Sequence, residues 1–165
     1  MPMAQLTNIA GADGLGFSSG PVIQDVYNSS TTVTIPFGTL VQLVTPITTT
    51  TTTVFAVKPA TTTASQAPLN IGVAVGASQD AGPGSAIASP GTGQVVIHGH
   101  CRALFDATTS PTVAGHYAII GGTTAGALTD SGGTTAAAGL DYGVVLEAIT
   151  ISSGTSLVNI WFEKT

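Results

Sequence analysis

The chain has 165 residues, of which only 7% are charged and 43% are hydrophobic, and its formal net charge is −5. A chain of this length fits one domain that buries about 70% of its unfolded surface. Its three cations, Lys58, Arg102 and Lys164, are isolated from one another in sequence. Nucleic-acid binding needs clustered cations against phosphates, so the composition argues against it.

The single cysteine, Cys101, has no partner for an intrachain disulfide, which fits a reducing compartment. The first ten residues lack the basic region and apolar run of a secretory signal. No window approaches the ~18 uninterrupted apolar residues of a membrane span. We therefore expect a soluble protein that is made in the cytoplasm.

Residues 1–20 differ from the rest of the chain because their apolar side chains show no alternation. These side chains are Leu6, Ile9, Leu15 and Phe17. A segment without a regular apolar face cannot bury these groups by itself. We predict an extended arm over residues 1–20 that docks on a neighbouring molecule, followed by one β-domain over residues 21–165. A frayed terminus is the alternative.

Helix signals are weak, since the chain carries 21 glycines, 9 prolines and many β-branched residues. Short apolar runs separated by turn residues instead predict strands. The expected strands are Val22–Tyr27, Thr31–Ile35, Thr39–Val44, Val54–Val57, Ile71–Gly76, Val95–Asp106, Tyr117–Ile120, Tyr142–Ile151 and a C-terminal strand through Val158, Ile160 and Phe162. Many short strands of this kind predict an all-β fold, a small barrel or sandwich.

Two of the expected strands show clear alternation. Between Val95 and Asp106 the odd positions are apolar, so His98, His100 and Arg102 share the opposite, wetter face. At the C-terminus, Trp161 lies opposite the apolar side chains of its strand. In a two-layer domain Trp161 would be buried in the core. The alternative is an anchor between subunits, where tryptophan is enriched.

A weak internal repeat is visible in the sequence. The segment Ile71-Gly72-Val73-Ala74-Val75-Gly76-Ala77 matches Tyr142-Gly143-Val144-Val145-Leu146-Glu147-Ala148, and upstream of each lies a glycine-led strand that begins near Gly38 or Gly115. Two related β-units that fold into one barrel would explain this pattern. Chance similarity in so biased a composition is the competing explanation.

The run His98-Gly99-His100-Cys101 places two imidazoles on one face of a strand. A zinc site needs three or four protein ligands, and Cys101 points to the opposite face. We therefore favour polar residues on a solvated or intersubunit face, and we expect no metal. A subsidiary hypothesis is that these histidines make an interface that responds to mild acid.

Two further patterns carry little chemistry. Gly16-Phe17-Ser18-Ser19-Gly20 matches the nucleophile elbow of hydrolases, but Pro21 and a β-like run follow, whereas the elbow must open a helix. We expect an ordinary loop there, with no catalytic residue and no cofactor. The threonine run Thr48–Thr53 predicts a solvent-facing edge or loop. A homopolymeric run puts threonines on both faces of a strand, which weakens an ice- or glycan-binding alternative.

Several short motifs, in this order, resemble a family of small proteins encoded beside tailed-phage capsid genes, the capsid decoration or cement proteins. The matching residues are Pro36-Phe37-Gly38-Thr39-Leu40-Val41, Ile71-Gly72-Val73-Ala74, Val95-Val96-Ile97-His98-Gly99, Ala114-Gly115-His116-Tyr117 and Tyr142-Gly143-Val144-Val145-Leu146-Glu147-Ala148. The resemblance covers roughly residues 20–165. The threonine run and Ala136-Ala137-Ala138 are not signatures of the family.

The resemblance implies a barrel or tulip-like domain on the outer face of a virion head, with the major capsid protein as partner. Such proteins typically form homotrimers that bridge neighbouring capsomers, without catalysis. The candidate interface residues in this chain are Leu6, Ile9, Leu15, Phe17, His98, His100, Arg102 and Trp161. A head-fibre or adhesin-like module that uses the threonine-rich loops on a host glycan is the alternative function.

Overall fold

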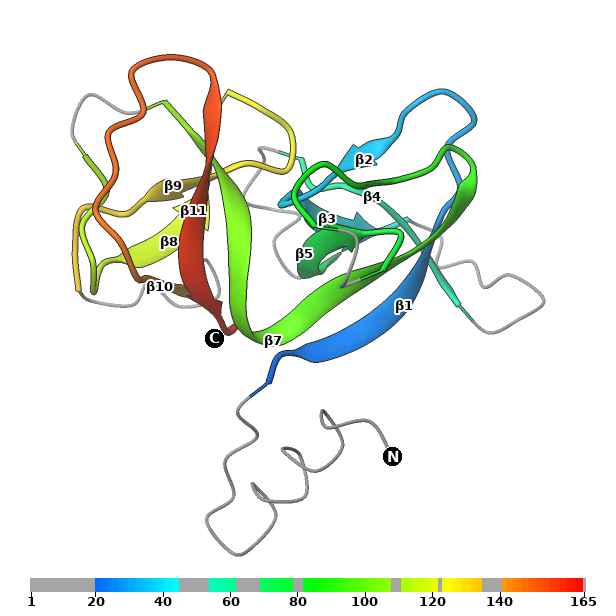
Figure 1. Cartoon of the computed structure of the whole chain (residues 1–165), viewed down its shortest axis with the longest axis horizontal. Helices are drawn as coiled ribbons and strands as arrows, with labels where there is room; N and C mark the ends of the chain where they lie inside the picture. Colours follow the sequence, from blue (N-terminus) through cyan, green and yellow to red (C-terminus); the bar gives the residue numbers. More distant parts are fainter. Residues whose placement is uncertain are drawn as a thin grey trace, which may run out of the picture.

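The computed structural model describes residues 20–44, 54–61, 69–78, 82–107, 111–121, 123–134 and 141–164. These residues form strands, turns and loops, with no α-helix among them, so the predicted all-β class is confirmed. Figure 1 shows two β-barrels side by side that are joined by the long strand β7. Strand β7 spans Gly91–Asp106 and belongs to both barrels.

Barrel 1 contains the N-terminal half of β7 and four earlier strands. In order around the ring these are β1 (Val22–Asn28), β4 (Phe55–Pro59), β3 (Leu40–Leu43) and β5 (Asn70–Gly76). Strand β5 pairs with β7, and β7 pairs with β1, which closes the ring. The short pair β2 (Ile35–Pro36) and β6 (Ala86–Ile87) adds Ile35 and Ile87 to the interior.

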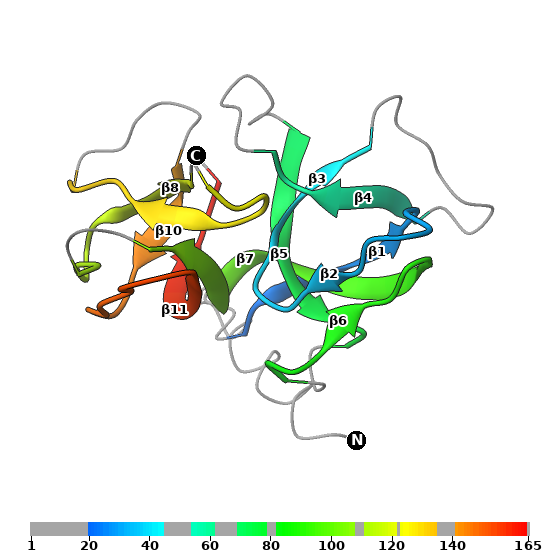
Figure 2. The same cartoon turned by 90° about the horizontal axis from the view of Figure 1, so that it is seen from above.

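Barrel 2 contains the C-terminal half of β7 and the four remaining strands. In order around the ring these are β11 (Thr155–Phe162), β10 (Asp141–Val145), β8 (Tyr117–Ile120) and β9 (Leu128–Asp130). A parallel bridge between Phe105 of β7 and Leu128 of β9 closes this ring. In Figure 2, which looks from above, β7 passes from one barrel into the other.

The two barrels are structural repeats of each other. Strands β1, β3, β4, β5 and the first half of β7 correspond to the second half of β7, β8, β9, β10 and β11. Each pairing in the following list has its counterpart in the other barrel: Leu40↔Val73 matches Tyr117↔Val144, Gln42↔Asn70 matches Ile119↔Asp141, Val73↔Val96 matches Val144↔Trp161, Asn28↔Val57 matches Phe105↔Leu128, and Val26↔Gly93 matches Ala103↔Val158.

The strand pairing bears out the repeat that the sequence indicated, but it corrects the expected architecture. The repeated segments are β5 and β10, and the glycine-led strands before them are β3 and β8. Each unit closes a ring of its own, whereas we expected both to contribute to one barrel. Sequence similarity indicates that two strands are alike, but it does not indicate which strands, distant in the sequence, they pair with.

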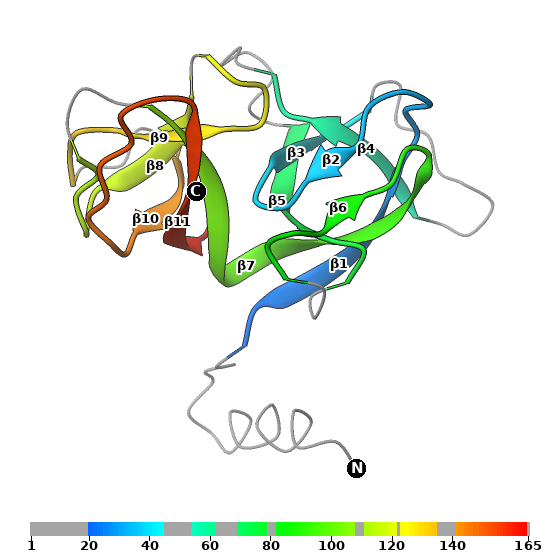
Figure 3. The ribbon, with the colours of Figure 1, turned by 45° about the horizontal axis from the view of Figure 1, so that its top comes forward.

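Strand β7 serves both barrels because it bends sharply between them, as Figure 3 shows. Its pairing changes from β1 to β11 between His98 and Gly99. Gly99 has φ of 106°, a conformation that favours glycine. A Cβ atom at this position would also lie 3.0 Å from the Cα of Pro21, in the segment that enters β1. The bend therefore needs glycine for both its backbone conformation and its close contact.

The barrels are held together by apolar packing and backbone hydrogen bonds. The amide of Leu40 in β3 donates to the carbonyl of Gly126, between β8 and β9, at 2.7 Å. The amide of Leu104 in β7 donates to the carbonyl of Gly38, ahead of β3, at 2.8 Å. One buried cluster includes side chains from both barrels, among them Val73 and Phe162.

Two predicted strands are wrong in extent. In the first, Thr31–Ile35, only Ile35 is in a strand, because the Ser30 hydroxyl accepts hydrogen bonds from the amides of Thr32 and Val33 and turns the chain. In the second, Tyr142–Ile151, the strand ends at Val145.

Candidate interaction surface at the junction of the barrels

The exposed face of β7 matches the alternation in the sequence. The side chains of His98, His100 and Arg102 are exposed, whereas Cys101 and Ala103 between and after them are buried. His100 is paired with Trp161 of β11. The rings of His98 and Trp161 make an edge-to-face contact, with centroids 5.6 Å apart and planes at 85°. We call these four residues, His98, His100, Arg102 and Trp161, the junction surface.

The interpretation of Trp161 as a core residue is wrong. Its side chain is 37% exposed, while Ile160 and Phe162 on either side are fully buried. The alternation along β11 is therefore correct, but among the described residues only one face of this strand is fully buried. An exposed tryptophan that packs on a histidine is a suitable contact group for another molecule.

The other predicted interface residues lie outside the described part of the chain. These are Leu6, Ile9, Leu15 and Phe17, and the same holds for the serines of the Gly16–Gly20 motif and for Thr48–Thr53. The first described residue, Gly20, leads through Pro21 into β1. The N-terminal segment is therefore attached beside the bend of β7.

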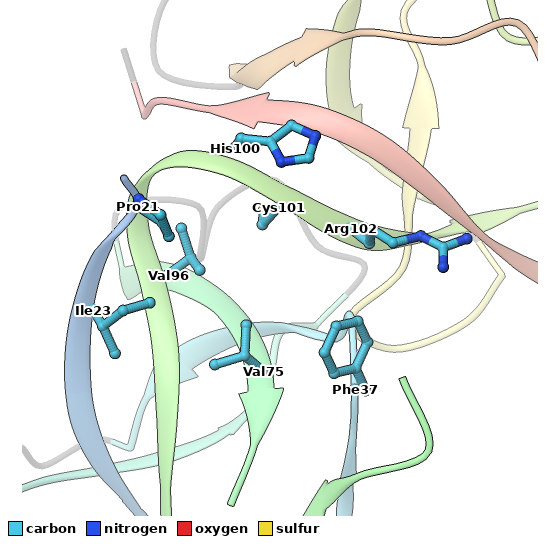
Figure 4. A pocket seen from close by; sticks show the side chains of 8 residues that line it. All are labelled: Pro21, Ile23, Phe37, Val75, Val96, His100, Cys101 and Arg102. Carbon is cyan, nitrogen blue, oxygen red and sulfur yellow. The ribbon is translucent and has the colours of Figure 1, made fainter. Parts of the chain in front are cut away.

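An apolar cleft of about 430 Å³ opens next to the junction surface. Figure 4 shows its lining, which comes from β1, β5, β7 and the segments before β1 and β3: Pro21, Ile23, Phe37, Val75, Val96, His100, Cys101 and Arg102. In Figure 4 the imidazole of His100 projects toward β11, and the Arg102 side chain extends past Phe37. The cleft thus has an apolar floor with two polar side chains at its rim.

Cys101 does not add nucleophilic chemistry to this cleft. Burial of its side chain raises the pKa of the thiol to about 12, so the thiol is protonated at neutral pH. A thiolate is the form that attacks electrophiles and binds metals. Within the described residues, histidine, cysteine and carboxylate side chains form no group of three that is placed to hold a metal ion.

The third histidine, His116, has a different role. Its Nδ1 lies 2.8 Å from Oδ1 of Asp130, and this carboxylate also accepts hydrogen bonds from the amides of Val113 and Gly132. Partial burial alone would raise the pKa of Asp130, but the hydrogen bonds outweigh this effect and lower the pKa. The network ties β9 to the loops around β8, and it lies in barrel 2.

A buried polar contact links the barrels on another side. The amide of Asn70 in β5 donates to the hydroxyl of Tyr142 in β10 at 2.7 Å, and Lys164 donates to the carbonyl of Asn70 at 2.9 Å. Desolvation raises the pKa of the Tyr142 phenol and lowers the pKa of the Lys164 ammonium. These hydrogen bonds join β5 of barrel 1 to β10 and the C-terminal segment of barrel 2.

Sequence reasoning placed the junction surface but missed the cleft. Val75 was expected in a strand and Phe37 between two expected strands of one barrel, and nothing local in the sequence shows that a second barrel packs against them. The available signal was Gly99, since a glycine inside a long strand pattern indicates a bend or a close backbone approach.

Comparison of the sequence with known protein families and with curated proteins finds no match. Among the described residues, no helix is long and apolar enough to cross a membrane.

Proposed function

We propose that this protein is a structural decoration protein of a tailed-phage capsid. It binds the outer face of the head shell, contacts the major capsid protein and bridges neighbouring capsomers as a homo-oligomer, without catalysis. The contacts come from the junction surface and from the N-terminal segment 1–20.

The observation that carries the proposal is the junction surface beside the apolar cleft. Trp161 is exposed, and the cleft next to it is lined by Ile23, Phe37 and Val96. The N-terminal segment 1–20 joins the rest of the chain at this place, since the next residue, Pro21, lines the cleft. A surface of this kind supports association with another protein, because each apolar side chain that it buries contributes about 1.5–3 kcal/mol before ordering costs.

The resemblance of the short motifs to capsid decoration proteins supplies the identity of the partner. Decoration proteins act in many symmetric copies, so modest contacts per copy give strong attachment through avidity. A low charge content also supports assembly, since few charged groups must be desolvated on contact.

The test is the copy number of this chain relative to the major capsid protein in purified particles, measured by quantitative mass spectrometry. A one-to-one ratio, or a fixed simple fraction, supports regular decoration of the shell. A few copies per particle would move the protein to a fibre or tail component, and absence from the particles would refute the virion assignment.

A truncation tests the role of the N-terminal segment. We expect a chain that lacks residues 1–20 to fold, because strands between Val22 and Phe162 close both rings, and to bind undecorated heads more weakly than the full chain. Co-sedimentation with heads measures the binding, and circular dichroism checks the fold. Equal binding by both chains would show that the segment is not an attachment arm.

A further inference from the structure

The apolar cleft beside the bend of β7 is open among the described residues. Its floor includes Val75 and Val96 of the buried cluster that the barrels share, and Ile23 and Phe37, which pack against this cluster and are only half-buried. An apolar cavity of about 150 Å³ already holds a benzene ring. Because the cleft has a volume of about 430 Å³, it has room for more than one apolar side chain.

The N-terminal segment 1–20 is tethered at the edge of this cleft. Pro21, the residue after the segment, belongs to the lining. A Cβ atom on Gly99 would lie 3.0 Å from the Cα of Pro21 and 3.6 Å from the carbonyl oxygen of Gly20, so the end of the segment is held against the bend of β7. Phe17 precedes Pro21 by four residues. Four residues of extended chain span at most about 14 Å, so Phe17 lies within reach of the cleft.

The short tether favours a contact within one chain over a contact between two chains. A short flexible linker gives the tethered group an effective concentration on the order of millimolar. A second copy of the chain, or a peptide of another protein, reaches this value only in very concentrated solution. The N-terminal segment of the same chain is therefore the occupant that the cleft meets first.

The side chains of the segment have a spacing that suits the cleft. Leu15 and Phe17 are two positions apart, so in an extended conformation both point to the same side. Gly16 between them has no side chain to hold the backbone away from the cleft. Asp13 continues the same spacing, and it is the only charged side chain among the first twenty residues.

The charge at the rim of the cleft is complementary to Asp13. Arg102 is exposed, lines the cleft and forms no ion pair with the residues that the structure describes. Figure 4 shows Pro21 at one end of the lining, and Phe37 and Arg102 at the other. The residues Ser18-Ser19-Gly20 are typical of turns and allow the chain to reverse there. A segment that crosses the cleft from Pro21 thus brings its acidic residue to the basic end.

We propose that residues 13–17 of the N-terminal segment fold back onto the cleft of their own chain. Leu15 and Phe17 occupy the apolar floor, and Asp13 pairs with Arg102 at the rim. The cleft is the docking site for the base of the segment.

This inference rests on the proposed function for the role of the remaining part of the segment. Leu6 and Ile9 stay outside the cleft, and they are the apolar side chains that reach a neighbouring molecule. An arm that is anchored at its base has fewer residues to order on binding than an arm that is free along its whole length. The docked base therefore makes attachment through the outer part of the arm more favourable.

Nuclear magnetic resonance of the purified full chain tests the contact directly. We expect nuclear Overhauser effects between the ring protons of Phe17 and the methyl groups of Ile23, Val75 and Val96. These three residues line the cleft, so the effects can arise only if the ring lies in it. Their absence, with all four residues assigned, would overturn the proposal.

Substitutions in the segment provide a matched comparison. Leu15→Ser and Phe17→Ser should each shift the methyl signals of the cleft, because each removes an apolar side chain from its floor. Leu6→Ser is the control, since it makes the same change as Leu15→Ser in the same segment and should leave these signals in place. Asp13→Asn should shift them by less, because an exposed ion pair contributes little. Cleft signals that respond to Leu6→Ser and not to Leu15→Ser would overturn the assignment of residues 13–17.

A mixture of isotope-labelled and unlabelled chains separates docking within one chain from exchange between copies. The proposal expects no Overhauser effect between a labelled cleft and an unlabelled segment, because each segment occupies the cleft of its own chain. Effects between the two kinds of chain would show that the segment of a second copy fills the cleft, and they would overturn the proposal.

These measurements use no particles, so their failure and the failure of the proposed function are distinguishable. A chain whose cleft shows no contact with Phe17, but which is present at a fixed ratio in virions, refutes the docked base alone. A chain whose segment docks as described, but which is absent from virions, refutes the capsid assignment alone.

Discussion

The two barrels fill equivalent interiors with different side chains. Barrel 1 has Val26, Val41, Val57, Ala74 and Val95 inside, and barrel 2 has Ala103, Ala118, Leu128, Val145 and Ile160 at the matching positions, all of them fully buried. Two positions are smaller in barrel 2 and three are larger, so the total number of side-chain carbons is unchanged. Volume-conserving exchange of this kind preserves a packed core.

The outward faces differ in what covers them rather than in their polarity. The row Leu40, Val73 and Val96 is buried in the cluster that the barrels share, whereas in the equivalent row of barrel 2 Tyr117 and Val144 are half-buried and Trp161 is exposed. If the second face were an ordinary solvated surface, polar residues would stabilise the isolated chain equally well. The retention of apolar side chains at these positions is what points to a partner.

The largest expected effect comes from a pair of matched glycines. Gly72 and Gly143 occupy the same position in the two barrels, and a Cβ on either would collide with the carbonyl oxygen of the residue opposite, Val96 or Trp161. Gly143 also has φ of 118°, whereas Gly72 is not in the positive-φ region. We expect Gly143→Ala to lower the free energy of unfolding by about 4 kcal/mol and Gly72→Ala by about 2 kcal/mol.

Urea denaturation followed by tryptophan fluorescence measures both free energies. Gly132→Ala serves as the control for positive φ without a collision, because Gly132 has φ of 75° and open space around it. Equal losses of unfolding free energy for Gly72→Ala and Gly143→Ala would contradict this prediction. They would show that the positive φ of Gly143 adds no cost to the substitution.

Part of this architecture was accessible from the sequence. The alternation along β7 and β11 correctly placed His98, His100 and Arg102 outside and Phe162 inside, because a strand with one covered face has a period of two. The short pairings that close the rings, such as Phe105 with Leu128, were not predictable, since they join residues through the arrangement of several intervening strands. The exposure of Trp161 was not predictable for the same reason, since it depends on how the strands of the two barrels are arranged.

A second comparison concerns the residues at the two ring closures. Asn28 of barrel 1 and Phe105 of barrel 2 are equivalent, and both are fully buried. Asn28 donates to the carbonyls of Val33 and Ala88, at 2.8 and 3.0 Å. Replacing Asn28 by Ala leaves both carbonyls without this donor and should cost about 2 kcal/mol.

Thermal unfolding of Asn28→Ala checks this expectation, with Thr34→Ala, an exposed position of the neighbouring loop, as the control. A loss of stability no larger than that of the control would mean that water replaces the side-chain amide of Asn28 as hydrogen-bond donor at no cost. The side chain of Asn28 would then stabilise barrel 1 through packing alone, as the apolar side chain of Phe105 does at the equivalent position of barrel 2.

Lowering the pH should destabilise barrel 2 before barrel 1. Burial alone would raise the pKa of Asp106, but hydrogen bonds from Thr123 and Thr124 lower it. Burial would likewise raise the pKa of Asp130, but hydrogen bonds from Gly132, Val113 and His116 lower it. A lowered folded-state pKa stabilises the protein above the ordinary pKa of aspartate, and this stabilisation is lost as the pH falls through the folded-state value. We expect a loss of about 1–2 kcal/mol below about pH 4.

Hydrogen exchange of individual amides at decreasing pH locates the loss. The amides of β8 and β9 should lose protection before those of β3 and β4, and Asp130→Asn should flatten the pH dependence. Asp25→Asn, an exposed carboxylate of barrel 1, is the control. Simultaneous loss of protection in both barrels would show that the shared strand β7 makes them unfold as one unit.

The smallest effect on the isolated chain is expected at Trp161, and its counterpart Val96 provides the contrast between the barrels. Val96→Ala removes a buried side chain and should lower the free energy of unfolding by about 2 kcal/mol. Trp161→Ala removes a far larger side chain, but one that is exposed, so at concentrations where the chain is monomeric it should cost about 0.5 kcal/mol or less. At concentrations where copies associate, the order should reverse, because the larger side chain would then be the buried one. Unfolding measured at low and high protein concentration tests this expectation. A cost for Trp161→Ala that does not grow with concentration would mean that Trp161 faces solvent in the assembled protein.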